Sequence, residues 1–433
     1  MLRITGVKLP LSYTEKDLMR RAADLLGVPV RSCRLRRRSV DARKKENVHF
    51  TATLDVTVEN EDKVLRRAKG NVTRVTDTPY VVPAPAAQPD LPPVVVGSGP
   101  AGLFAALTLA QAGVRPILLE RGGDVDSRRT AVDTFHRTGV LDTANNVQFG
   151  EGGAGTFSDG KLNTGIKDAR CRTVLETFVR FGADKSILID AKPHIGTGVL
   201  TGIVKNIRNE IISLGGEVRF GAKLDGIYKS GNKLCGISVN GERIPCGEVV
   251  LCVGHSARDT FKMLCENGIE MVRKPFSMGV RIEHLQSDIN RALYGRFADH
   301  PALNAADYKL ATHLQNGRGV YSFCMCPGGE VVNASSESGG IVVNGMSNSL
   351  RDGVNANSAL LVGVEPDDIA GDNVLGGCEY QRVIEKHAYE IAQGAVPVTT
   401  VGRFVFGDNT DVGRIKPTVK PDFAICDFDG ARD

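Results

Sequence analysis

Four residues of this chain have the types and the spacing needed to hold a dinucleotide. Gly97, Gly99 and Gly102 follow the G-x-G-x-x-G pattern, and Glu120 lies 18 residues beyond the third glycine. The first glycine permits a tight turn, the second lets backbone approach a pyrophosphate, and the third allows a helix to pack closely. The acid is placed to accept hydrogen bonds from a ribose diol. The alternative, a structural turn that binds nothing, leaves an acid at this spacing unexplained.

The surrounding sequence predicts the elements that must position these residues. The apolar run 94–96 is typical of a strand, an Ala- and Leu-rich helix follows from residue 103, and 116–119 is a second apolar run. The amino end of that helix offers unpaired N–H groups and the positive end of a dipole. We therefore predict cofactor contacts by Gly97, Ser98, Gly99, Pro100, Ala101, Gly102, Glu120 and Arg121.

A second segment is also rich in glycine, with five glycines between residues 150 and 160. Its free backbone suits the close approach of a flat polar ring or a phosphate. The alternative is a flexible loop, but Phe149 and Phe157 favour an ordered and packed one. We predict that Gly152, Gly153, Thr156 and Ser158 contact the cofactor.

Later segments add one glycine to this predicted site. Residues 248–253 read as a buried strand that returns to the same sheet and ends at Gly254, which we expect close to the cofactor. Between them, helices are predicted over 170–182 and 202–214, a strand pair over 216–227, and a hairpin around 240–241.

Two further features could carry chemistry. His284 lies on a predicted strand and could donate a proton, although a structural role is commoner for a lone histidine. Cys324 and Cys326 would point the same way on a strand and could form a redox pair. A disulfide across one residue would be strained, which favours two packed thiols. The catalytic acid or base therefore stays unassigned.

Composition limits the class of protein. The 433 residues are 42% hydrophobic and 24% charged, and the net charge of +4 is too small to predict a nucleic-acid or membrane partner for the whole chain. The ten cysteines show no C-x-x-C pair and no zinc spacing, so we predict no metal site. No signal peptide or membrane-length apolar run is present. We expect a cytoplasmic protein with reduced thiols.

The first 77 residues form a distinct basic unit, with 18 Lys and Arg against 10 Asp and Glu. Its patterns predict a β-α-β-β-α-β order. The segment 34–45 could bind RNA or phosphate, or it could be a solvated strand face or contact the acidic remainder of the chain. No aromatic residues interleave its basic ones, which favours the latter readings.

The motifs together resemble a known family. Residues 97–102 with Glu120 and Arg121 look like the FAD-binding start of glutathione-reductase-like flavoproteins. Segments 149–161, 253–259, 275–284 and 323–329 resemble the bacterial FAD-dependent, or NAD(FAD)-utilising, dehydrogenases. The resemblance implies FAD as cofactor, with Glu120 on the adenosine ribose and the 150–160 loop near the isoalloxazine. It implies no particular substrate.

We therefore expect an α/β protein of three domains. Residues 1–77 form a small basic α+β (ferredoxin-like) domain, and 78–92, with many prolines, a linker. Residues 93–274 form a Rossmann-like FAD-binding domain, and 275–433 an α+β substrate-side domain. Flavoproteins of this kind end with Gly-Asp and a helix. Gly407-Asp408 has the letters but no helical pattern after it, so we expect that a C-terminal segment is missing and this domain incomplete.

The expected function is an FAD-dependent oxidoreductase, a dehydrogenase of unknown substrate. No second G-x-G-x-x-G follows a strand, so we expect no separate NAD(P)H domain of the disulfide-reductase type, although NAD(P)H could still reach the flavin directly as electron donor. We expect a small molecule as the substrate. One alternative is an RNA-associated flavoprotein that uses the basic N-terminal segment. Another is a non-catalytic flavin- or nucleotide-binding protein. The oligomeric state is not predicted.

Overall fold

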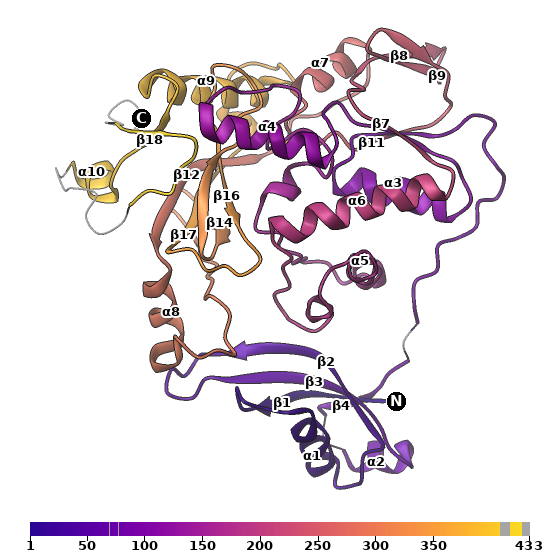
Figure 1. The fold of residues 1–433 in the computed structure, drawn as a ribbon, viewed down its shortest axis with the longest axis vertical. Helices are drawn as coiled ribbons and strands as arrows, with labels where there is room; N and C mark the ends of the chain where they lie inside the picture. The colour runs from indigo at the N-terminus through magenta and orange to yellow at the C-terminus, as the bar shows by residue number, and fades with distance from the viewer. Residues whose placement is uncertain (69, 77, 408–415, 427–433) are drawn as a thin grey trace.

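The elements of the chain fall into three groups. A computed structural model describes residues 1–68, 70–76, 78–407 and 416–426. The N-terminal group lies at one end, and a long extended segment leads from it to a sheet flanked by helices (Figure 1). The C-terminal half forms a further set of sheets beside that one. Among the described residues, none of the helices combines the length and the apolar character that crossing a membrane requires.

The N-terminal group is one antiparallel sheet with two helices. Its strands lie in the order β2-β3-β1-β4. Leu2, Ile4 and Leu54 are fully buried between sheet and helices. The first helix begins at Glu15, and the carboxylate of Asp17 in its first turn accepts a 2.8 Å hydrogen bond from the amide of the capping residue Thr14. The elements are β1 (Leu2–Leu9), α1 (Glu15–Leu26), β2 (Ser32–Asp41), β3 (His49–Thr57), α2 (Glu61–Arg67) and β4 (Val72–Arg74).

The basic segment of this group is strand β2, and one of its arginines binds the next group. The backbone of Arg38 pairs with Ile189 and Ala191, each through a 2.8 Å hydrogen bond. Its guanidinium donates to the Asp190 carboxylate at 2.9 Å and to the Tyr13 hydroxyl at 3.2 Å. Arg38 therefore makes the contact with the acidic remainder that was one of the predicted alternatives.

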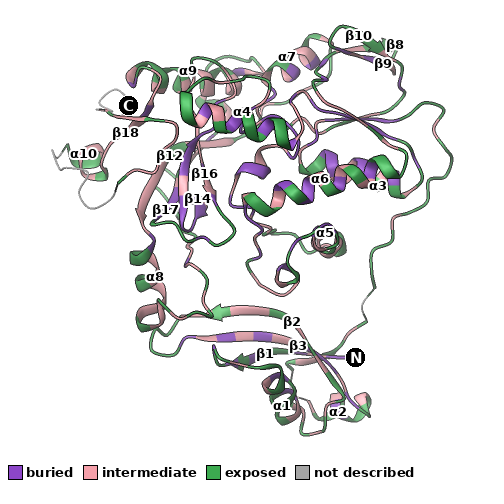
Figure 2. Cartoon of the chain, viewed as in Figure 1, coloured by how far each residue is buried: buried purple, intermediate pink, exposed green. Residues whose placement is uncertain are grey.

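The central group is built on a parallel sheet in the order β11-β5-β6-β7. Val95 and Leu118 are fully buried on the face that α3 and α6 cover, and buried and exposed residues alternate along α6 because one side of the helix faces the sheet (Figure 2). A three-stranded antiparallel sheet, β10-β9-β8, packs on the opposite face. The elements are β5 (Val94–Val96), α3 (Pro100–Gln111), β6 (Ile117–Leu119), α4 (Val125–Thr138), α5 (Ala169–Arg180), α6 (Thr197–Ser213), β7 (Glu217–Arg219), β8 (Leu224–Ser230), β9 (Lys233–Val239), β10 (Glu242–Ile244), β11 (Val249–Leu251) and α7 (Arg258–Glu266).

Two local predictions in this group need correction. The segment 216–227 is no strand pair, because β7 joins the parallel sheet while β8 joins the antiparallel one. The return strand β11 is less buried than predicted, because it lies at the edge of its sheet. Val250 and Leu251 are 39% and 44% exposed. The hairpin around 240–241 is as predicted, with positive φ at both residues.

The C-terminal group contains a four-stranded antiparallel sheet in the order β12-β17-β14-β13 and two smaller sheets. The predicted strand at 275–284 is β12. Residues 409–414, for which no helix was expected, lie outside the described residues, as does Asp408. The elements are β12 (Phe276–Leu285), α8 (Gln286–Tyr294), β13 (Ala311–His313), β14 (Gly319–Cys326), β15 (Gly329–Asn333), β16 (Val343–Ser347), β17 (Asn355–Val364), α9 (Gly376–Ile391), β18 (Val396–Val398), α10 (Val401–Phe406) and β19 (Phe423–Ile425).

Candidate cofactor site

The turn between β5 and α3 requires glycine for steric reasons. Gly97 has a φ of 97°, and a Cβ there would lie 2.4 Å from the carbonyl oxygen of Cys252. A Cβ on Gly102 would lie 1.7 Å from the carbonyl oxygen of Gly97. Helix α3 begins at Pro100, and its first amides have no partner within the helix. The turn therefore presents free N–H groups and a positive helix end at the carboxyl edge of the sheet.

The glycine loop, residues 150–160, packs directly against this turn. The amide of Gly152 donates to the carbonyl oxygen of Ser98 at 2.9 Å. Gly153 has a φ of 61°, and a Cβ there would lie 2.9 Å from the Cα of Gly99. Two stretches of bare backbone thus meet beside the start of α3, with no side chain between them.

A buried hydroxyl in the glycine loop supports a bound ligand. Thr156 lies on a short 3-10 turn, Ala154–Phe157, and is completely buried. Its Oγ1 has no hydrogen-bond partner among the described residues. Leaving such a group unpaired costs about 1–3 kcal/mol, so a ligand that supplies a partner would be stabilised here. The bare backbone, the helix end and this hydroxyl together fit the polar parts of a dinucleotide.

Glu120 follows β6 as predicted, but both of its carboxylate oxygens already accept hydrogen bonds from other residues of the chain. One carboxylate oxygen accepts from the amide and hydroxyl of Ser98 at 2.9 and 2.7 Å. The other accepts from the amides of Gly122 and Gly150 at 2.9 and 3.0 Å. Its side chain therefore ties the glycine turn to the glycine loop, and its contact with a ribose stays a prediction.

Arg121 lies at the same edge of the sheet. Its guanidinium lies 4.3 Å from the centre of the Phe149 ring and donates to Asp259 at 2.8 Å. That contact, with a further hydrogen bond from Lys223, lowers the pKa of Asp259 to about 2 despite burial. Gly254 has a φ of 72°, and no described atom lies within 4 Å of a Cβ built there.

Ser158 closes the glycine loop on itself. Its hydroxyl donates to the carbonyl oxygen of Gly155 at 2.7 Å and accepts from the amide of Gly160 at 3.1 Å. Its own carbonyl oxygen accepts from Thr197 at the start of α6, at 2.7 Å. Phe157 is buried, as the ordered-loop prediction requires. Cofactor contact by Ser158 stays a prediction.

One residue that holds the start of the glycine loop in shape was not expected from the sequence. Arg128 lies on α4 and is completely buried. Its guanidinium donates to the carbonyl oxygens of Asn146, Val147 and Glu151 at 2.9, 2.8 and 2.7 Å. Burial lowers the pKa of Arg128 to about 10, so it still carries its charge at neutral pH. The sequence did carry a signal for helix α4: Asp124 is a typical N-cap residue, and apolar residues follow on one helical face, the face on which Arg128 lies.

The far end of the glycine loop binds the C-terminal sheets. Asp159 forms a buried ion pair with Arg351 through two hydrogen bonds, one of them 2.8 Å long. Lys161 forms an ion pair with Asp159 at 2.6 Å and donates to the carbonyl oxygen of Met325. Just before the loop begins, Gln148 donates to the carbonyl oxygen of Ala334 at 2.7 Å. The loop is therefore fixed to both halves of the molecule.

His284 makes its ring contact with Tyr308, and not with the glycine turn or the glycine loop. Its ring lies 5.5 Å from that of Tyr308, centre to centre, and its Nε2 is buried without a partner among the described residues. Burial lowers the pKa of His284, which favours the neutral ring. A role as proton donor stays a prediction.

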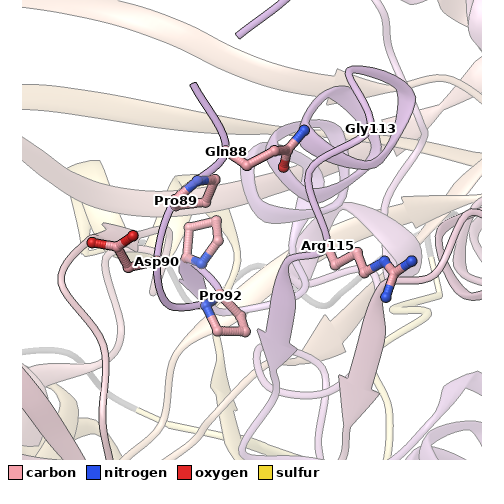
Figure 3. Close-up of a pocket in the computed structure, with 7 residues that line it drawn as sticks. Gln88, Pro89, Asp90, Pro92, Gly113 and Arg115 are labelled. Atoms are coloured by element: carbon pink, nitrogen blue, oxygen red, sulfur yellow. The ribbon is translucent and has the colours of Figure 1, made fainter. Parts of the chain in front are cut away.

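The hollow shown in Figure 3 is a different place from the glycine turn. It measures about 470 Å³ and lies between the linker and the segment before β6. Pro93 and Arg115 lie before the first residues of β5 and β6, so this hollow faces the amino ends of those strands. Ligands of parallel sheets bind at the carboxyl ends. It is lined by Gln88, Pro89, Asp90, Pro92, Pro93, Gly113 and Arg115.

Comparisons with known proteins agree with the dinucleotide chemistry of this site. Residues 90–187 match the family described as FAD binding domain, and 275–431 match "FAD-dependent protein, C-terminal domain-like". Residues 1–57 match a domain of unknown function. An uncharacterized protein of Clostridium beijerinckii is 47% identical over 388 residues, which are 88% of this chain and 73% of that protein. The chain belongs to this family of FAD-dependent proteins.

FAD is therefore the cofactor, and the chain is an FAD-dependent oxidoreductase. Solved structures are more distant. Thermovibrio ammonificans THI4 is 18% identical with a TM-score of 0.27, over 42% of this chain and 66% of that one. CtdE in complex with FAD is 15% identical with a TM-score of 0.28, over 70% of this chain and 69% of that one.

Proposed function

We propose that the chain is an FAD-dependent dehydrogenase that takes electrons from a nicotinamide or a small organic substrate. The observation that carries the proposal is the meeting of Gly153 and Gly99 beside the unpaired hydroxyl of Thr156. FAD, when bound, accepts and returns electron pairs. The free amides of α3 would hold its pyrophosphate, and Thr156 would donate a hydrogen bond to it.

The packing of the central group supports a finer assignment to the glutathione-reductase-like flavoproteins. Helices α3 and α6 cover one face of the parallel sheet, and an antiparallel sheet covers the other. A Rossmann-like unit of this kind places its ligand at the carboxyl ends of the strands. The ten cysteines, all free thiols, support a cytoplasmic location.

The test is a spectral titration of the purified protein. We expect a yellow protein with a flavin spectrum, or a colourless one that gains the spectrum when FAD is added. Anaerobic addition of NADH or NADPH should then bleach it if that nucleotide is the donor. A protein that takes up no FAD at all contradicts the cofactor site. Flavin that neither nucleotide bleaches, but that dithionite reduces, leaves an organic substrate as the electron source.

A further inference from the structure

Cys324 and Cys326 lie where the C-terminal sheet loses its regular pairing. Strand β14 pairs with β17 at Phe323 opposite Ala359 and resumes at Cys326 opposite Asn357, so β14 holds one extra residue. Cys324 has a φ of 45°, which is uncommon for a residue with a side chain. The bulge brings the two sulfur atoms to 3.9 Å, whereas alternate residues of a regular strand are about 7 Å apart.

The two thiols have different surroundings. Cys326 is completely buried, and its thiol donates to the carbonyl oxygen of Cys324 at 3.2 Å. Cys324 is only partly buried. A thiol that attacks an external disulfide must be reachable, while the thiol that resolves the product needs only to reach its neighbour.

The pKa values of the two thiols are shifted in opposite directions, although the charges of Lys161 and Arg281 lower both. A hydrogen bond from Cys326 and the positive charges of Lys161 and Arg281 lower the pKa of Cys324 to about 6, although burial and Asp159 act in the opposite direction. The same hydrogen bond and burial raise the pKa of Cys326. At neutral pH, Cys324 is therefore the thiolate and hence the nucleophile.

Two glycines leave room around the buried sulfur. A Cβ on Gly345 would lie 2.7 Å from the Sγ of Cys326, and one on Gly329 would lie 3.1 Å from its Cβ. Any larger residue at 345 would crowd the sulfur. Forming a bond of about 2.05 Å requires the sulfurs to approach by roughly 2 Å, which a bulged backbone can accommodate better than a regular strand.

We propose that Cys324 and Cys326 form a reversible dithiol–disulfide couple that exchanges with small disulfides. The Cys324 thiolate attacks one sulfur of the small disulfide, and the first small thiolate leaves. Cys326 then loses its proton and attacks the Cys324 sulfur, which expels the second small thiolate. The dithiol is oxidised by two electrons and the small disulfide is reduced to two thiols. Their protons come from Cys326 and from the solvent that took the Cys324 proton.

This activity goes beyond the dehydrogenase proposal, because none of its steps uses FAD. The proximity of Lys161 to both the cysteine strand and the glycine loop places the couple next to the cofactor site. If the two cysteines served only to pack the sheet, both thiols would stay reduced under all conditions that leave the fold intact.

The test uses the full chain equilibrated with mixtures of reduced and oxidised glutathione. After acid quenching and alkylation, trypsin releases the peptide 319–351, which holds these two cysteines and no other. As oxidised glutathione increases, we expect the doubly alkylated form of this peptide to be replaced by an unalkylated form, two hydrogen atoms lighter than the free dithiol peptide. Dithiothreitol added before alkylation should restore the doubly alkylated form. A peptide that keeps both thiols at every glutathione ratio, in folded protein, overturns the proposal.

Two single variants separate the roles of the thiols. Cys326→Ser should accumulate one glutathione on Cys324, because the resolving thiol is gone. Cys324→Ser should form neither the internal disulfide nor appreciable glutathione adduct. Cys378, whose pKa burial raises, is the control thiol and should react slowly in all three proteins. Rapid glutathionylation of Cys326 in Cys324→Ser would contradict the assigned order. Circular dichroism and thermal melting confirm that each variant is folded.

Discussion

The guanidinium of Arg128 donates a 2.7 Å hydrogen bond to the carbonyl oxygen of Glu151, inside the glycine loop. With the bonds to Asn146 and Val147, one buried cation binds three carbonyl oxygens in residues 146–151, the stretch that leads into the glycine loop and begins it. The side chain of Glu151 is buried close by, and burial raises its pKa. The shape of the loop therefore depends on a residue some twenty positions earlier in the chain.

We expect Arg128→Lys to destabilise the protein and weaken FAD binding. A lysine cannot bond three carbonyls in the fixed directions of a guanidinium, and each buried carbonyl left unpaired costs about 1–3 kcal/mol. Denaturant unfolding and FAD titration measure the two effects. Arg129→Lys is the matched control, because Arg129 is the next residue and makes one bond, to Thr201 at 2.8 Å. Equal behaviour of the two variants would contradict the role of Arg128.

Gly153→Ala should weaken FAD binding, whereas Gly155→Ala should have little effect. At Gly153 a methyl group meets the Cα of Gly99 at 2.9 Å, and the backbone conformation, with φ 61° and ψ −169°, is essentially restricted to glycine and adds about 1–3 kcal/mol of strain. At Gly155 the nearest atom is 3.6 Å away, an ordinary contact. Fluorescence titration with FAD compares the variants, and similar affinities would show that the close approach is unimportant.

The alkylation rate of Cys324 should follow a titration with a midpoint near pH 6. The thiolate reacts, so the rate rises with pH and levels off above neutrality. At pH 7 its thiolate fraction exceeds that of a thiol of pKa 9.0 by about 90-fold, and lower nucleophilicity reduces this to roughly fourfold in rate. Lys161→Gln removes a positive charge and should move the midpoint upward by about one unit. Peptide mass spectrometry gives the rates, and a midpoint near 9 in the wild type would refute the charge argument.

Arg38→Ala should loosen the N-terminal group from the rest of the chain. It removes the contacts to Asp190 and Tyr13, which are half-exposed and worth about 1–2 kcal/mol together. Limited proteolysis should cut the linker 78–92 faster in this variant. Arg37→Ala is the control, because Arg37 is an exposed neighbour on the same strand.

The same arginines test the nucleic-acid alternative. We expect no RNA binding that falls steeply with salt, in the wild type or after replacing Arg36, Arg37 and Arg38 by alanine. Salt-dependent binding in filter assays, lost in the triple variant, would establish the alternative function.

Local signals were sufficient to predict much of the fold. The strand, glycine turn and helix at residues 94–111 were predictable because each step needs a specific residue type within a few positions. The capped helix from Glu15 and the hairpin around 240–241 follow from equally local patterns. The separation of β7 from β8 was not predictable, because sheet membership depends on packing against β6 and β9, far away in sequence.

The candidate site was predictable only in part. Its glycines could be recognised in the sequence because so many glycines within a few residues are rare. The role of Arg128 could not be recognised, because burial of a charged side chain depends on carbonyl oxygens that only the folded loop presents. The short distance between Cys324 and Cys326 was also hidden, since a regular strand predicts a larger separation and the bulge arises from pairing with β17.

The pairing of Arg38 with Ile189 and Ala191 has a consequence for solubility. Strand β2 is the outermost strand of its sheet, and these two backbone bonds cover part of its free edge. An uncovered edge strand offers a row of amides and carbonyls to any other chain and promotes aggregation. The edge of the N-terminal sheet is therefore protected by a neighbour as well as by the arginines of β2, and residues 1–77 produced alone should self-associate more readily than the full chain.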